Sequence, residues 1–147
     1  MQDNLHVTVA AIAVNEDRFL MVHESIQGKS VYNQPAGHLE ENESLPEAVV
    51  RECLEETAWL VKPAYITGIY QWTHPVNQQT FLRVCYFVEQ YEKHDRPLDK
   101  EIIAAVWFTR DELVQEQANL RSPLVLRCID DYLAGRRYPL DLITHLT

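Results

Sequence analysis

The sequence has few basic residues and no long hydrophobic run, and each shortage excludes a class of protein. With 13 Lys and Arg against 22 Asp and Glu, the formal net charge is -9. That balance argues against nonspecific binding to nucleic acid or to an anionic membrane, although bound cations would still admit an anionic substrate. No apolar stretch reaches membrane-spanning length, and no basic N-terminal region precedes an apolar run. We therefore expect neither a transmembrane helix nor a secretory signal.

Cysteine is also scarce, with three residues in 147: Cys53, Cys85 and Cys128. An odd number, two of them inside apolar patterns, argues against a disulfide framework and favours a reducing, cytoplasmic compartment. The sequence contains no internal repeat, low-complexity segment or linker. With 46% hydrophobic and 24% charged residues, residues 1–147 are predicted to form one domain with a substantial core. A monomer and a homodimer both remain open.

The strongest pattern lies in residues 37–59. Ser44 is a good N-cap, and Glu47 three residues later completes a capping box. Pro46 falls in the first turn, where a missing N–H costs nothing. The segment after Ser44 is therefore predicted to be a helix. Its expected core-facing stripe comprises Val49, Val50, Cys53 and Leu54.

Three glutamates gather on another arc of this helix: Glu52, Glu55 and Glu56. Like charges at these spacings destabilise a helix by a few tenths of a kcal/mol per pair. No basic residue lies on the arc, although Arg51 can reach Glu55 from beside it. A divalent cation such as Mg²⁺ or Mn²⁺, which prefers oxygen ligands, would turn this repulsion into a binding site. A solvated acidic face is the alternative that the three glutamates alone leave open.

Apolar and β-branched segments predict strands along the rest of the chain, at residues 6–14, 19–23, 65–73, 80–90 and 102–109. Residues 19–23 are expected to return as the hairpin partner of residues 6–14. Pro35-Ala36-Gly37 predicts an extended approach and then a tight turn. Residues 91–99 read as a solvated loop.

Two further helices are predicted near the C-terminus. Thr109 and Glu112 form a capping box for a helix through about residue 118. Ser122 and Pro123 open the next helix, as N-cap and first helical residue, and Gly135 ends it. Strands before, between and after helices, without regular βαβ alternation, indicate an α+β fold.

The spacing over residues 37–59 resembles the Nudix box, in which a Gly is followed after five residues by Glu, and after seven more by Arg-Glu-hydrophobic-X-Glu-Glu-X-Gly-hydrophobic. The matching residues are Gly37, Glu43, Arg51, Glu52, Cys53, Glu55, Glu56 and Trp59. Ala58 departs from the pattern, because the family usually has Gly there to end the helix in a left-handed conformation. A non-glycine residue in that conformation costs about 1 kcal/mol. We expect this change to affect the local backbone and not the metal ligands.

The resemblance to Nudix hydrolases implies an α/β/α sandwich with a mixed β-sheet and the box helix under one end. It implies Mg²⁺, with Mn²⁺ as a possible substitute, held by Glu52, Glu55 and Glu56, often with the backbone carbonyl of Gly37. It also implies that Arg51 and Glu43 pair to fix the box.

Nudix enzymes differ in the residue that deprotonates the attacking water. Some use a glutamate of the box and others an acid on a distant loop. Glu52 is the first candidate for this general base, and Glu101, just before the strand at 102–109, is the second. The plain alternative for Glu101 is an exposed loop acid.

Several residues outside the box are candidates for binding substrate. Arg83 projects from an apolar strand toward a possible phosphate, and Arg121 precedes a helix N-terminus, where backbone N–H groups favour anions. Trp72 and Tyr32 offer rings that can stack on a base. His38, in the expected turn, is a further candidate for the pocket. The alternatives are exposed cations for the arginines, a core position for Trp72 and an exposed loop position for His38.

The segments 33–40, 71–72, 81–83, 119–125 and 137–140 look like those of the bacterial phosphatase NudJ subgroup. This likeness implies Mg²⁺-dependent release of orthophosphate from nucleoside tri- and diphosphates and from the hydroxymethylpyrimidine pyrophosphate of thiamine metabolism. One alternative is a Nudix enzyme that cuts nucleoside diphosphate-X compounds, such as ADP-ribose, into two monophosphates. The other is a non-catalytic Nudix ligand sensor, which the intact acids of the box disfavour.

Overall fold

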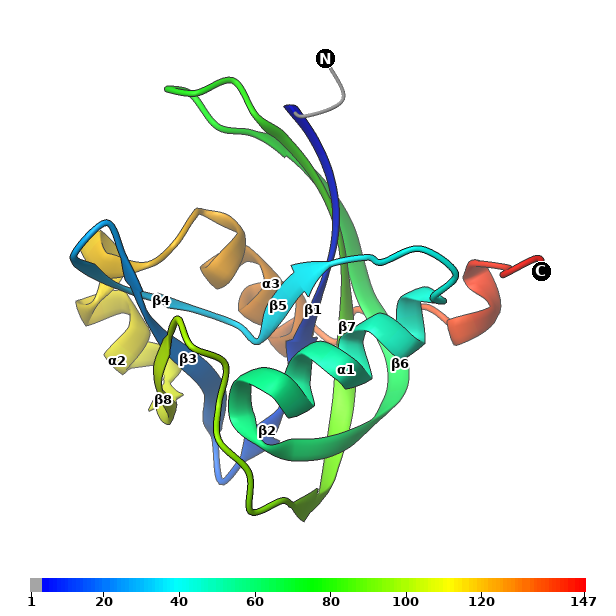
Figure 1. The fold of residues 1–147 in the computed structure, drawn as a ribbon, viewed down its shortest axis with the longest axis horizontal. Helices are drawn as coiled ribbons and strands as arrows, with labels where there is room; N and C mark the ends of the chain where they lie inside the picture. The colour runs from blue at the N-terminus through cyan, green and yellow to red at the C-terminus, as the bar shows by residue number, and fades with distance from the viewer. Residues whose placement is uncertain (1–3) are drawn as a thin grey trace.

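Two four-stranded β-sheets form the centre of the molecule in the computed structural model, which describes residues 4–147 (Figure 1). The first sheet has the order β5-β1-β7-β6. Its strands are β5 (Ala36–His38), β1 (Leu5–Ile12), β7 (Thr80–Lys93) and β6 (Trp59–Thr73). Strand β1 runs antiparallel to β5 and parallel to β7, so this sheet is mixed, as predicted.

The second sheet is antiparallel and is built around one strand. Strand β3 (Arg18–Ile26) pairs with β2 (Val14–Asn15), with β4 (Lys29–Asn33) and with β8 (Ile102–Thr109). Strand β8 has the predicted bounds. Each remaining predicted strand is found with shifted ends.

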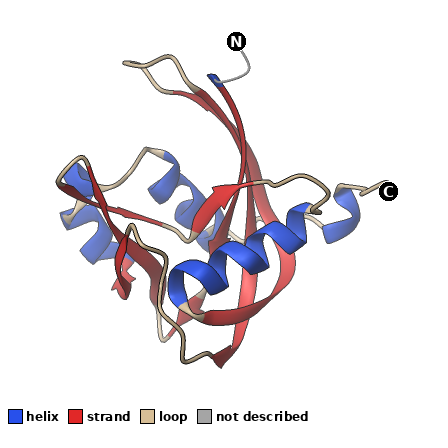
Figure 2. Ribbon diagram, viewed as in Figure 1, coloured by secondary structure: helices blue, strands red, loops and turns tan. Residues whose placement is uncertain are grey.

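The three α-helices lie on opposite sides of the first sheet (Figure 2). They are α1 (Leu45–Thr57), α2 (Arg110–Gln115) and α3 (Leu124–Leu133). A short 3₁₀ turn, η2 (Gln117–Asn119), follows α2, and another, η3 (Leu140–Leu142), follows α3. Within residues 4–147, no helix has both the length and the apolar character to cross a membrane.

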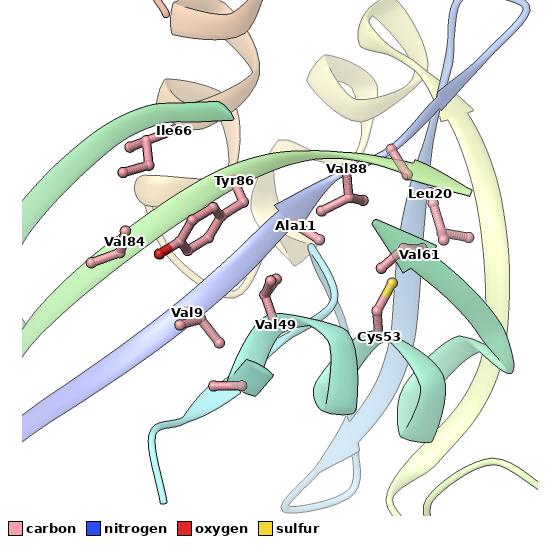
Figure 3. Packing of buried hydrophobic residues seen from close by; sticks show 12 residues of the cluster. Val9, Ala11, Leu20, Val49, Cys53, Val61, Ile66, Val84, Tyr86 and Val88 are labelled. Carbon is pink, nitrogen blue, oxygen red and sulfur yellow. The ribbon is translucent and has the colours of Figure 1, made fainter. Parts of the chain in front are cut away.

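Strand β1 shows how the layers form, because alternate residues of a strand point to opposite faces. Val9 and Ala11 pack in a cluster with Val49 and Cys53 of α1 (Figure 3). The intervening residues of β1 pack in a second cluster with Val125, Cys128 and Ile129 of α3. The sheet therefore lies between helices, which confirms the predicted α+β sandwich.

The N-terminus of α1 has the predicted capping box. The Glu47 N–H donates to Ser44 Oγ at 3.2 Å, and the Ser44 N–H donates to Glu47 Oε1 at 2.8 Å. The helix ends at Ala58, whose φ of 65° is the left-handed conformation usual for the glycine it replaces. The Ala58 N–H still donates to the Leu54 carbonyl at 2.9 Å. The substitution therefore leaves the end of the helix in place.

Removing the Ser44 cap is expected to lower the free energy of unfolding. The Ser44→Ala variant should lose about 1 kcal/mol, because one N–H of the first turn loses its acceptor. Urea unfolding followed by circular dichroism measures the change. The Ser30→Ala variant, at an exposed position of β4, should stay within about 0.5 kcal/mol of the parent. Equal losses in both variants would contradict this role of Ser44.

The predicted hairpin between residues 6–14 and 19–23 is wrong except at its tip. Val14 and Asn15 pair with β3, across a turn in which Glu16 and Asp17 have positive φ. Strand β1 instead pairs with β5 and β7, so the chain changes sheets at Ala13. A short local pattern does not reveal such a change, because apolar residues on either side of Ala13 are buried in both sheets alike.

Other boundaries also moved. The predicted loop at 91–99 starts later, because β7 continues to Lys93 opposite the long strand β6. The predicted N-cap of the last helix is displaced: α3 starts at Leu124 after Pro123, although Ser122 Oγ still accepts the Leu124 N–H at 3.1 Å. Gly135, at φ 81°, follows the end of α3 as predicted.

Candidate active site

A cavity of about 660 Å³ lies beside β5 and the second half of α1. Its lining combines acids, cations and aromatic rings from parts of the chain that are distant in sequence. Among them are Glu24, Gly37, His38, Glu52, Glu56, Trp72, Phe81, Arg83 and Arg121. Such a mixture suits a ligand that carries both negative charge and a ring.

Glu52 packs against the backbone of β5 at Gly37. Gly37 is extended within β5 and pairs with Val9, so the predicted tight turn at Gly37 is wrong. A Cβ atom on residue 37 would lie 1.7 Å from Glu52 Oε2. A glycine is therefore needed here for close approach of the carboxylate to the backbone, and not for a turn conformation.

Arg51 holds the acids of the box in one network. Its Nε and Nη2 donate to Glu43 Oε2 and Oε1 at 2.6 and 3.0 Å, which is the predicted two-pronged pair. Its Nη1 donates to Glu52 Oε1 at 2.7 Å and to Glu55 Oε1 at 3.1 Å. A further bond from Nη2 to the His38 carbonyl, at 3.0 Å, ties the helix to β5. Hydrogen bonding to Arg51 also lowers the pKa of Glu43.

Glu56 is buried one turn after Glu52, and its Oε1 accepts the Ala36 N–H at 2.9 Å. Burial raises the pKa of Glu56 to about 9 and that of Glu52 to about 7. Neighbouring acids contribute to both raised pKa values: Glu55 and Asp99 for Glu52, and Glu52, Glu24 and Asp99 for Glu56. Two buried carboxylates near other acids are costly when ionised, and a bound cation would remove that cost.

The donors fit a hard divalent cation by their chemistry, since Glu52 and Glu56 present carboxylate oxygens to the cavity. Glu55 is partly exposed beside them, on the other side of Arg51. Within residues 4–147, no three acidic, histidine or cysteine side chains already converge closely enough to hold a metal. Binding of an ion would therefore require these side chains to move closer together.

The raised pKa of Glu56 predicts how the stability of the metal-free protein depends on pH. Its pKa is near 4.5 in an unfolded chain and about 9 when folded, so the folded state keeps the proton between these values. The free energy of unfolding should then fall as pH rises from about 5 to about 9, by an amount on the order of a few kcal/mol from this residue.

Denaturant unfolding in EDTA, at several pH values, measures this effect. The Glu56→Gln variant cannot ionise, so its stability relative to the parent should increase steadily across the range. A difference between the two proteins that stays constant, or shrinks toward pH 9, would contradict the assignment.

Four of the predicted substrate-binding residues line the cavity. Arg83 is 5% exposed, which rules out the exposed-cation alternative. Arg121 is half-exposed, and its Nη1 donates to Glu24 Oε2 at 3.2 Å. Trp72 is partly buried, with its ring 5.9 Å from that of Phe81. His38 is exposed, and its Nε2 is 2.9 Å from Nδ1 of His6.

Five predicted site residues lie outside the lining of the cavity: Glu43, Arg51 and Glu55 of the box, and Tyr32 and Glu101 away from it. The ring of Tyr32 packs 4.9 Å from His23 and 5.1 Å from Phe108. Glu101 is exposed, and its backbone carbonyl accepts the Ser25 N–H at 3.4 Å. Tyr32 is thus packed away from the cavity, whereas Glu101 is near enough to Glu24 for its charge to help raise the pKa of that residue.

The structure also adds residues that the sequence had not singled out. Glu24 is buried in the cavity after an irregularity of β3 between His23 and Glu24, and burial raises its pKa. Asn33 and Gln34 are buried beside Arg83. A lone acid within the apolar strand β3 was a signal for Glu24, whereas Asn33 and Gln34 gave no chemical signal of their own.

Comparison with known proteins gives consistent matches. Residues 4–128 match the NUDIX domain family model. The chain is 42% identical over 139 residues to "Phosphatase NudJ" of Escherichia coli K12, covering 94% of this chain and 90% of that one. It is 45% identical to a NUDIX hydrolase from Nitrosomonas europaea, with a TM-score of 0.93 and coverage of 96% and 97% of the two chains. The NUDIX domain of Shewanella oneidensis NrtR, solved with ADP ribose, is 19% identical over 89% of this chain and 88% of that one, with a TM-score of 0.68. This last likeness concerns the fold alone.

Proposed function

Because the chain belongs to the Nudix hydrolase family, we propose that it releases orthophosphate from nucleoside tri- and diphosphates and from hydroxymethylpyrimidine pyrophosphate, with Mg²⁺ as cofactor. One observation carries the proposal: Glu52, Glu56 and the buried cation Arg83 line a single cavity. That arrangement suits a chain of phosphates whose end reaches Arg83. The relative from Escherichia coli K12 is named a phosphatase, which agrees with cleavage at a terminal phosphate.

Glu52, Glu55 and Glu56 would hold the divalent ion, with the Gly37 carbonyl as a further ligand. When bound, Mg²⁺ would neutralise phosphate oxygens and make a water more acidic.

Glu52 would accept the proton of the attacking water at Oε2, since Oε1 already accepts a hydrogen bond from Arg51. Its pKa of about 7 is close to the value that suits a general base at neutral pH. Glu101 is the weaker candidate for this task because it is exposed and does not line the cavity. Arg51, held by Glu43, would orient Glu52.

Arg83 and Arg121 would bind phosphate oxygens and stabilise the charge that develops on the transferred group. Trp72 would stack on the base or pyrimidine ring at the other end of the substrate. The ring of Tyr32 is packed elsewhere, so we leave the stacking role to Trp72. His38, at the cavity edge, would contact the substrate.

A panel of substrates tests this function. Purified protein with Mg²⁺ is incubated with GTP, GDP, hydroxymethylpyrimidine pyrophosphate and ADP-ribose, and the products are identified by chromatography and an orthophosphate assay. We expect orthophosphate from the first three compounds. AMP and ribose phosphate from ADP-ribose, without orthophosphate from the others, would instead show a nucleoside diphosphate-X hydrolase. No turnover of any compound would favour a ligand sensor.

A further inference from the structure

Arg83 is a buried cation whose contacts include no carboxylate. It is 5% exposed, and none of the ion pairs found within residues 4–147 includes it. The other cation of the cavity, Arg121, is half-exposed and already paired with Glu24. A buried charge without a counter-ion is costly, and such a group is commonly retained where a ligand supplies the opposite charge.

The side chains around Arg83 hold it without neutralising it. Its Nη1 donates to Gln34 Oε1 at 2.9 Å, and its Nη2 donates to Asn33 Oδ1 at 3.3 Å. Both oxygen acceptors are amides, which orient a guanidinium but carry no net charge, and the third acceptor is Cys128 Sγ at 3.9 Å from Nη1. The Nε atom is buried and has no hydrogen-bond partner. The five N–H groups of this cation thus outnumber its three acceptors, which leaves donors for a ligand of the cavity.

Gln34 fixes this arrangement to the rest of the fold. Its side chain is fully buried, at 1% exposure, and its Nε2 donates to the Val125 carbonyl of α3 at 2.7 Å. One amide therefore joins the segment before β5, the helix α3 and the strand β7. Replacing Gln34 with an apolar residue would leave both of its buried hydrogen-bond partners, the Val125 carbonyl and Arg83 Nη1, without this partner.

The position of Arg83 sets which part of a substrate it can reach. Arg83 pairs with Thr8 on the neighbouring strand, and Thr8 pairs with His38 of β5. Two strand spacings separate it from β5, or about 10 Å, and Glu52 packs against Gly37 of that strand. Glu52 and Arg83 line the same cavity, so phosphates held near Glu52 would have to extend along it for their end to meet Arg83.

We propose that Asn33 and Gln34 form a neutral amide cradle that reserves the charge of Arg83 for the terminal phosphate of the substrate. The cradle would select compounds that end in a free, doubly charged phosphate over compounds whose phosphates are all esterified. Gln34 and Asn33 act as positioning residues, since they touch Arg83 and reach the substrate through it. This inference rests on the proposed function and adds to it the feature of the substrate that is recognised.

Binding of two matched ligands tests the proposal. One is the β,γ-methylene analogue of GTP, which cannot be hydrolysed at that linkage, and the other is the same compound with a methyl ester on its terminal phosphate. Calorimetry with Mg²⁺ should show that the wild-type protein binds the free terminal phosphate at least about tenfold more tightly. The Asn33→Asp variant, which keeps the acceptor but neutralises Arg83, should bind both ligands with nearly equal affinity.

Three variants separate this effect from other causes. Asn33→Ala, which removes an acceptor and adds no charge, should keep most of the preference. Asn77→Asp adds the same charge at the exposed rim of the cavity and should keep it too. Cys128→Ser also should keep it. This variant is needed because Cys128 Sγ lies 3.9 Å from Arg83 Nη1, and Cys85 and Arg83 lower the pKa of Cys128, so its thiol is a competing source of negative charge.

The outcomes distinguish this proposal from the proposed function. Equal binding of both ligands by the wild-type protein, or an unchanged preference in Asn33→Asp, would overturn the cradle even if orthophosphate is released from GTP. A tenfold preference that disappears in Asn33→Asp would support the cradle even if the substrate panel showed another reaction. If Asn77→Asp also lost the preference for the free terminal phosphate, that preference would depend on the total charge of the cavity and not on Arg83. This result would also overturn the proposal.

Discussion

The Glu52→Gln variant is expected to release orthophosphate about 10³-fold more slowly than the parent protein, at saturating substrate and Mg²⁺. Glutamine keeps the shape of the side chain and an oxygen that accepts the bond from Arg51. It cannot take a proton from water, a contribution worth about 10² to 10⁴ in rate, and it is a poorer ligand for Mg²⁺. The change should therefore lower turnover while leaving the fold intact, as circular dichroism and thermal unfolding would show.

Glu41→Gln is the control for this variant, since Glu41 is an exposed acid of the same segment outside the cavity lining. Its turnover should stay within about twofold of the parent, because substitutions of exposed residues outside a site usually have small effects. A Glu52→Gln protein that kept more than a tenth of the parent activity would exclude Glu52 as the general base. Glu101→Gln would then be the next variant to measure.

The Gly37→Ala variant is expected to lose about 100-fold in turnover, the size of effect that displacement of a catalytic group by about 1 Å can produce. A Cβ at this position would lie 1.7 Å from Glu52 Oε2 and 2.1 Å from Glu52 Cδ. The carboxylate must therefore move, because the neighbouring backbone is held by pairing with Val9. Steady-state kinetics with GTP and Mg²⁺ measure the loss.

A second substitution separates displacement of Glu52 from general damage. Shortening the acid in Gly37→Ala/Glu52→Asp makes room for the new methyl, so the two changes together should cost less than the product of their separate effects. Gly135→Ala is the matched glycine control, because a Cβ there meets nothing within 4 Å. Its φ of 81° should cost about 1 kcal/mol of stability but no activity. If the double variant lost the full product of the two separate losses in turnover, the close contact between residue 37 and the Glu52 carboxylate would be contradicted.

The features predicted well from the sequence were those that a few neighbouring residues determine. The capping boxes at Ser44 and Thr109 were found as predicted, because each depends on residues three positions apart. The Arg51 and Glu43 pair also formed as expected from the resemblance to the Nudix box. The mixed sheet between helices came from that resemblance alone, since periodicity carries no information about which strands pair.

The features that were missed depend on contacts between distant parts of the chain. Gly37 was expected in a turn, whereas its role is to let Glu52 of another element approach β5. Arg83 was predicted on the correct face of its strand, but its burial requires Gln34 and α3, which local sequence does not show. Tyr32 and Trp72 offered equal aromatic rings, and only the fold distinguished them by placing Trp72 on the cavity.

The central claim is that the carboxylates of α1 bind a divalent cation on which phosphoanhydride hydrolysis depends. The most direct measurement follows orthophosphate release from GTP by protein stripped with EDTA, then titrated with Mg²⁺, alongside calorimetry of Mn²⁺ binding to the parent and to Glu56→Gln. We expect no release without metal, recovery on adding Mg²⁺, and Mn²⁺ affinity at least about tenfold weaker in the variant. Full turnover by the stripped protein, or equal Mn²⁺ affinity in parent and variant, would contradict the claim.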